Sequence, residues 1–203
     1  GGNVAFDGPV SISARGQLSV GSGGVIAADD AVRLAAPYVR LGTPFVAPFS
    51  PLDPTSPFTL SGQPYNFLPT SGPGSLTVIA SHIDVGNLSL RGIGSASLTA
   101  RGGDIRGNGT FNMAGNLRLT AGQIHPTTGS AFTIVAYDYE ENGTPRRGSI
   151  TIGQSGVRSL PLSGGGTLSL YASDIVQGGT LRAPLGTINL GWDGTGTAPR
   201  DLI

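Results

Sequence analysis

A short motif recurs along this chain at intervals of about 20 residues. Each copy is an alternating run of aliphatic and small polar residues, followed by a small residue, a turn and another aliphatic residue. A period of this length is typical of one coil of a β-solenoid, in which each coil holds two or three short strands. The clearest copies are residues 76–83, 96–105, 117–124 and 168–175, and looser copies occupy 10–14 and 32–36.

The alternation within each copy predicts which side chains point into the coil. Successive side chains of a strand point to opposite faces, so Leu, Val and Ile are expected inside and Ser, Thr and Arg outside. On this register Ile83, Leu119 and Leu170 point inward. No stretch of useful length shows the 3.6-residue apolar period of a helix. The sequence therefore predicts an all-β fold, a parallel β-solenoid with coils of about 20 residues.

The composition excludes several kinds of binding partner and of chemical site. The 34 glycines and 15 prolines approach the share found in disordered chains, but aliphatic residues at period two between the glycines indicate turns in a β protein. Twelve basic residues, all of them Arg, balance twelve acidic ones, so no basic stripe for nucleic acid or patch for anionic lipid is expected. The absence of cysteine excludes disulfides and thiolate metal sites. No apolar run is long enough to insert into a membrane.

Two segments interrupt the repeat within what we expect to be a single β-helix over 1–203. Residues 137–148 contain an Asn-Gly pair and both glutamates, which predicts a hairpin projecting into solvent. Residues 43–74 hold eight of the 15 prolines, which cannot donate to a ladder, so they are expected to leave the solenoid. The aromatics of this segment either cover apolar coil surface or bind a partner. These candidates are Phe45, Phe49, Phe58, Tyr65 and Phe67. Residues 192–203 are expected to be a linker toward the rest of a longer parent chain.

Aligning the copies places polar residues in columns across neighbouring coils. One column precedes the inward aliphatic and contains His82, Asp104, Gln123 and Asp174, with Thr187 in a similar place. The next outward column contains Asp84, Arg106 and His125, which predicts surface ion pairs.

Two interpretations of these columns stay open. An enzyme of this architecture could use Asp104 with His82 as an acid/base pair, or Asp104 with Asp84 or Asp174. The alternative is that turn positions in solenoids are ordinarily polar. We favour the second, because the acids are scattered singly and Gln123 lies between two of them. No metal-ligand cluster is visible, so neither a metal nor a cofactor is expected.

Two stretches, residues 117–129 with 132–136 and residues 174–191, resemble the filamentous haemagglutinin family of large exoproteins. The second contains the phrase Gln-Gly-Gly-Thr-Leu-Arg-Ala-Pro-Leu-Gly. The resemblance implies a right-handed parallel β-helix from a secreted or surface-anchored bacterial adhesin. It also implies export by two-partner secretion, through an outer-membrane partner. An interior or carboxy-terminal shaft is expected, without enzymatic activity, binding host or matrix glycans or cell-surface proteins. The rival expectation is a carbohydrate-active β-helix enzyme of the polysaccharide lyase or hydrolase type.

Overall fold

The computed structural model describes residues 2–45, 67–157, 160–161 and 163–191, and these residues form strands, turns and loops but no helix. No candidate for a membrane-spanning helix therefore occurs among them. The strands are β1 (Val4–Phe6), β2 (Val10–Ser13), β3 (Gln17–Val20), β4 (Val25–Ala28), β5 (Ala31–Ala35), β6 (Tyr38–Leu41), β7 (Thr70–Ala80), β8 (His82–Val85), β9 (Leu88–Ala100), β10 (Asp104–Gly107), β11 (Gly109–Ala114), β12 (Asn116–Ala121), β13 (Gln123–Pro126), β14 (Ala131–Tyr137), β15 (Tyr139–Glu141), β16 (Thr144–Arg146), β17 (Ser149–Gln154), β18 (Thr167–Ala172), β19 (Asp174–Gln177) and β20 (Thr187–Leu190).

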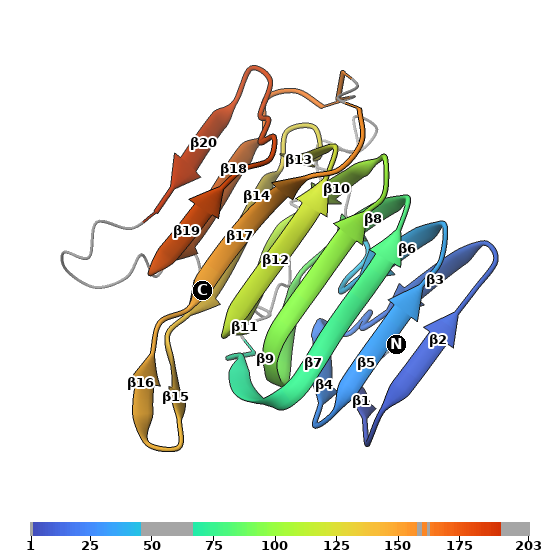
Figure 1. The fold of residues 1–203 in the computed structure, drawn as a ribbon. Helices are drawn as coiled ribbons and strands as arrows, with labels where there is room; N and C mark the ends of the chain where they lie inside the picture. Colours follow the sequence, from blue (N-terminus) through green and yellow to red (C-terminus); the bar gives the residue numbers. More distant parts are fainter. Residues whose placement is uncertain (1, 46–66, 158–159, 162, 192–203) are drawn as a thin grey trace, which may run out of the picture.

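The strands stack in parallel to give three faces (Figure 1). The first face runs through β1, β4, the start of β9, β11, β14, β18 and β20. The second runs through β2, β5, β7, the end of β9, β12, β17 and β19. The third is a separate five-stranded sheet in the order β13-β10-β8-β6-β3. The predicted all-β architecture with parallel sheets is confirmed, and its stacking is consistent with a β-helix or solenoid-like fold.

The core lies inside the three faces and follows the predicted alternation. Leu98 pairs with Leu119, and Ile105 pairs with both Ile83 and Ile124, so like side chains stack on like side chains. Ile83, Leu119 and Leu170 are buried, which confirms their predicted inward orientation. Burial of these stacked aliphatic residues stabilises each coil against its neighbours, at about 25 cal/mol per Å² of apolar surface.

The long strand β9 bends between the first and second faces. Gly92 sits at this bend with a φ of 69°, a left-handed conformation that favours glycine. A Cβ added there would come within 2.6 Å of the Ala28 carbonyl oxygen. The bend therefore requires glycine for two reasons, its backbone conformation and the close approach of the preceding coil.

The two predicted segments outside the repeat, 43–74 and 192–203, lie only partly within the described residues. Residues 46–66 and the expected linker 192–203 lie outside the described residues. The expected excursion extended to residue 74, whereas β7 already begins at Thr70. Irregular register between Thr70 and Ser75 accommodates Pro73, which cannot donate a ladder hydrogen bond.

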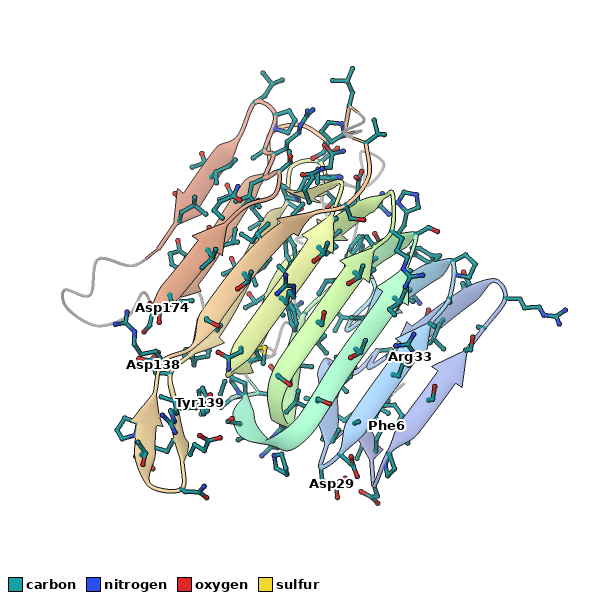
Figure 2. All side chains as sticks on the ribbon, viewed as in Figure 1. Phe6, Asp29, Arg33, Asp138, Tyr139 and Asp174 are labelled. Atoms are coloured by element: carbon teal, nitrogen blue, oxygen red, sulfur yellow. The ribbon has the colours of Figure 1, made fainter. Side chains whose placement is uncertain are left out.

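Residues 139–146 form an antiparallel hairpin that stands away from the three faces (Figure 1). Asn142 and Gly143 have φ values of 51° and 73°, as a two-residue hairpin turn requires. The base of the hairpin is tied to the following coil, near the labelled Asp138 and Asp174 in Figure 2. The Ser173 hydroxyl donates to Asp138 Oδ1 at 2.6 Å, and Arg147 Nε lies 3.1 Å from Asp174 Oδ2.

Candidate functional site

The outer surface of the third sheet carries two rows of polar side chains. Each short strand contributes two of them, on either side of one buried aliphatic residue. One row contains Tyr38, His82, Asp104 and Gln123, and the other contains Arg40, Asp84, Arg106 and His125. The predicted neighbours Asp84, Arg106 and His125 are thus confirmed as a row, in which parallel pairing places successive side chains about 5 Å apart.

Asp84 is the most heavily bonded residue of these rows. Arg106 binds it bidentately, with Nε 2.9 Å from Oδ1 and Nη2 2.6 Å from Oδ2. The Tyr38 hydroxyl donates to Oδ2 at 2.8 Å. The Asp84 side chain is only 6% exposed, whereas that of Arg106 is 45% exposed. The weak surface pair that the sequence suggested is thus a bidentate pair in which only the carboxylate is buried.

The electrostatics of this cluster follow from the same contacts. Hydrogen bonding to Asp84 raises the pKa of Arg106, which keeps the guanidinium charged. Burial raises the pKa of Tyr38, and its hydrogen bond to Asp84 acts in the same direction. The Arg106 guanidinium also lies over the ring of Phe45, 5.6 Å from the centroid, within cation–π range. Asp84 and the Phe45 ring therefore hold the Arg106 guanidinium in one orientation.

Asp104 forms the second cluster, one row away. Gln123 Nε2 donates to Asp104 Oδ2 at 2.9 Å, and His125 Nε2 lies 3.6 Å from the same oxygen. The other ring nitrogen of His125 is 2.9 Å from the Pro126 carbonyl oxygen. The His125 side chain is 4% exposed, compared with 18% for Asp104. The Asp104 side chain is therefore the more accessible of the two.

His82 contacts the backbone of Asp104, with no hydrogen bond between the two side chains. The Asp104 N–H donates to His82 Nδ1 at 3.4 Å. In this arrangement Nδ1 is the acceptor, so Nε2 carries the ring hydrogen and can donate outward. The His82–Asp104 acid/base pair considered from the sequence therefore has no direct side-chain contact.

These side chains line a groove of about 390 Å³ on the outside of the third sheet. Its floor is made by Tyr38, Asp84, Arg106, His82, Asp104 and His125, and its far wall by Leu160 and Pro161. We call it the third-sheet groove. Leu160 and Pro161 belong to the segment that follows β17, and sequence reasoning missed them as well as Tyr38.

The wall exists because one coil contributes no described strand to the third sheet. After β17 the chain turns at Gly156, with a φ of 88°, and passes against Gly102 of an earlier coil. Leu181 of the next coil then pairs directly with Ile124. The Ile124 N–H donates to the Thr180 carbonyl at 2.9 Å, and the Arg182 N–H donates to the Ile124 carbonyl at 3.0 Å. Leu160 and Pro161, in the stretch between β17 and β18, border the groove.

Two residues assigned to the first polar column lie elsewhere, and that part of the alignment was wrong. Asp174 pairs with Ser149 on the second face and binds Arg147 at the hairpin base. Thr187 pairs with Thr167 on the first face. All three faces alternate with period two, so the pattern alone does not distinguish one face from another.

The aromatic candidates are only partly within the described residues. Phe45 is half-buried against Arg106, beside the third-sheet groove, and Phe67 is 40% exposed. Phe49, Phe58 and Tyr65 lie outside the described residues. In the part of the chain that is described, no group of three or more His, Cys, Asp or Glu side chains could hold a metal ion.

Comparisons with known proteins do not identify a family for this chain. No protein-family model matches this chain, and no match was found among curated proteins or solved structures. The resemblance to filamentous haemagglutinin exoproteins therefore stays a prediction that rests on residues 117–129, 132–136 and 174–191.

Proposed function

We propose that this chain is a structural and adhesive segment of a secreted bacterial surface protein, built as a right-handed parallel β-helix. Parallel stacking in register over three faces supports a rigid shaft, since each coil is held by ladders and by a continuous core. Right-handed crossovers are the rule for parallel strands of one sheet. As in the filamentous haemagglutinin family, the parent chain would be exported through an outer-membrane partner and displayed at the cell surface.

A binding role is favoured over a catalytic one by the limited accessibility of the two carboxylates in the third-sheet groove. General acid/base hydrolysis of a glycoside ordinarily uses a pair of carboxyl groups that both reach the substrate. Asp84 is buried, and its oxygens already accept three hydrogen bonds from Arg106 and Tyr38. Asp104 alone of the two has a carboxylate that is partly accessible. The groove thus presents a fixed polar surface suited to holding a ligand.

The partners of such a segment would be host or matrix glycans or cell-surface proteins. The experiment is to coat beads with the purified chain and measure their attachment to epithelial cells and to neighbouring bacteria. Attachment above that of albumin-coated beads is the expected result. Equal attachment of the two kinds of bead would refute the adhesive role.

The rival carbohydrate-active enzyme is tested with the same protein. Incubation with pectin, alginate and glycosaminoglycans should release neither reducing ends nor unsaturated products. Turnover that disappears in Asp104→Asn would replace the adhesive proposal with the enzymatic one.

A further inference from the structure

We infer that the third-sheet groove is a binding site for a short neutral oligosaccharide, with Asp104, Arg106 and His82 as its polar contacts. The inference deepens the proposed adhesive function and rests on it. The groove has hydrogen-bond donors and acceptors on one side and the apolar side chains of Leu160 and Pro161 on the other. Its volume is at the lower end of the range for small-molecule sites, which suits a short saccharide.

The polar groups offer a mixed array of donors and acceptors. Arg106 uses Nε and one hydrogen of Nη2 for Asp84, which leaves further guanidinium hydrogens on its half-exposed side chain. Asp104 offers carboxylate lone pairs, and His82 offers an Nε2 hydrogen. His82 and Asp104 lie on adjacent strands, about 5 Å apart along the stack. Sugar hydroxyls both donate and accept, so neighbouring hydroxyls can use such an array.

The floor is pre-organised, which lowers the entropic cost of binding. Asp84 and Phe45 fix the Arg106 guanidinium from its edge and its face. The Gln123 side-chain amide donates to the Asp104 carboxylate and fixes it. Opposite them, Leu160 and Pro161 supply an apolar surface for the C–H face of a sugar ring.

The charge of the groove favours a neutral ligand over an anionic one. The guanidinium of Arg106 is already neutralised by Asp84. The Asp104 carboxylate adds a negative charge that would repel a phosphate, a sulfate or a uronate brought close to it. Neutral hexoses and N-acetylhexosamines avoid this repulsion and can still donate to Asp104 through charge-assisted hydrogen bonds.

The test is a glycan microarray followed by titration calorimetry on the strongest binder. One panel holds neutral tetrasaccharides of glucose, mannose, galactose and N-acetylglucosamine, and the other holds oligogalacturonate and heparin-derived tetrasaccharides. We expect a neutral tetrasaccharide to bind, and Asp104→Asn to weaken its binding by about tenfold or more through loss of charge-assisted bonds. His82→Ala alters an exposed side chain, so its binding loss is measured without risk to folding. The matched control is Thr77→Ala, on the outer surface of the second face, with unchanged affinity expected.

Several results would overturn the inference. These are no binding to the neutral panel, preference for the acidic panel, or wild-type affinity in both groove variants with folding verified by circular dichroism. The bead assay distinguishes a failure of the saccharide-site inference from a failure of the adhesive function. Beads that attach equally with wild-type and Asp104→Asn protein would leave adhesion standing and remove the groove from it. Saccharide binding that is weakened by Asp104→Asn, without any bead attachment, would support the groove as a saccharide site and refute the adhesive role.

Discussion

Replacing Arg106 by Met should destabilise the protein more than replacing its partner Asp84 by Asn. The methionine is of similar length but removes the hydrogen bonds at 2.9 and 2.6 Å, and it strands a carboxylate whose side chain is 6% exposed. Asp84→Asn instead strands a guanidinium that is already 45% exposed and can be hydrated. The asymmetry follows from burial, because an uncompensated charge is costly only where water cannot reach it.

The magnitude can be worked from the same geometry. Removing one partner of a fully buried pair costs about 3–5 kcal/mol. Water can enter part of the space left by the half-exposed Arg106 side chain, so we expect about 2 kcal/mol for Arg106→Met. In a chain of this length that corresponds to a fall in Tm of roughly 4–8 °C. Asp84→Asn should cost about 1 kcal/mol or less.

Thermal melts followed by circular dichroism measure both variants, and the double variant completes the cycle. Neutralising both positions should recover part of the loss caused by Arg106→Met, since no charge is then left buried. Arg118→Met is the matched control, because Arg118 is exposed on β12; its Tm should stay within about 1–2 °C of the wild type. A larger loss in Asp84→Asn than in Arg106→Met would refute the reasoning, because it would mean that the carboxylate is not the buried partner.

Three further outcomes are expected from thermal melts. Leu119→Asp would bury an unpaired carboxylate in the core and cost several kcal/mol, so a wild-type melt would show that the register is wrong by one residue. Gly107→Ala should lower the Tm because the added methyl overlaps the Phe132 ring, whereas Gly16→Ala, which has open space around it, should not; equal melts would place the ring elsewhere. The raised pKa of Tyr38 implies stability that is complete below the ordinary tyrosine value of about 10 and is lost as pH rises through the higher folded value. The alkaline decline in Tm should therefore be shallower in Tyr38→Phe, and identical pH profiles would contradict this linkage.

The repeat predicted the core well because inward side chains obey one simple rule. Leu98 and Leu119 stack as the 20-residue period requires, and Asp84 and Arg106 are neighbours for the same reason. Alternation fixes the orientation of a side chain but not its face, so Asp174 was placed in the wrong column. The assignment of a strand to a face depends on how much chain the preceding turns consume, which a short pattern does not record.

The candidate site was predicted only in part, because its burial depends on contacts between coils. Asp84 and His125 were expected at the surface, yet they are buried. Asp84 is enclosed by Arg106 above it and by Tyr38, which belongs to a strand 46 residues earlier. The wall formed by Leu160 and Pro161 lies where the described residues of one coil add no strand to the third sheet, and the alternating pattern carries no signal for that omission.

The direct pairing of Leu181 with Ile124 has a consequence for stoichiometry. A solenoid whose coils are all alike presents the same lattice of side chains at every step, and a ligand that fits one step fits the next with similar affinity. Among the described residues, the stretch between β17 and β18 adds no strand to the third sheet, and this breaks the translational symmetry where Leu160 and Pro161 border the outer surface. Binding at the third-sheet groove should accordingly saturate at one saccharide per chain, in place of the graded, multivalent occupancy of a uniform rod.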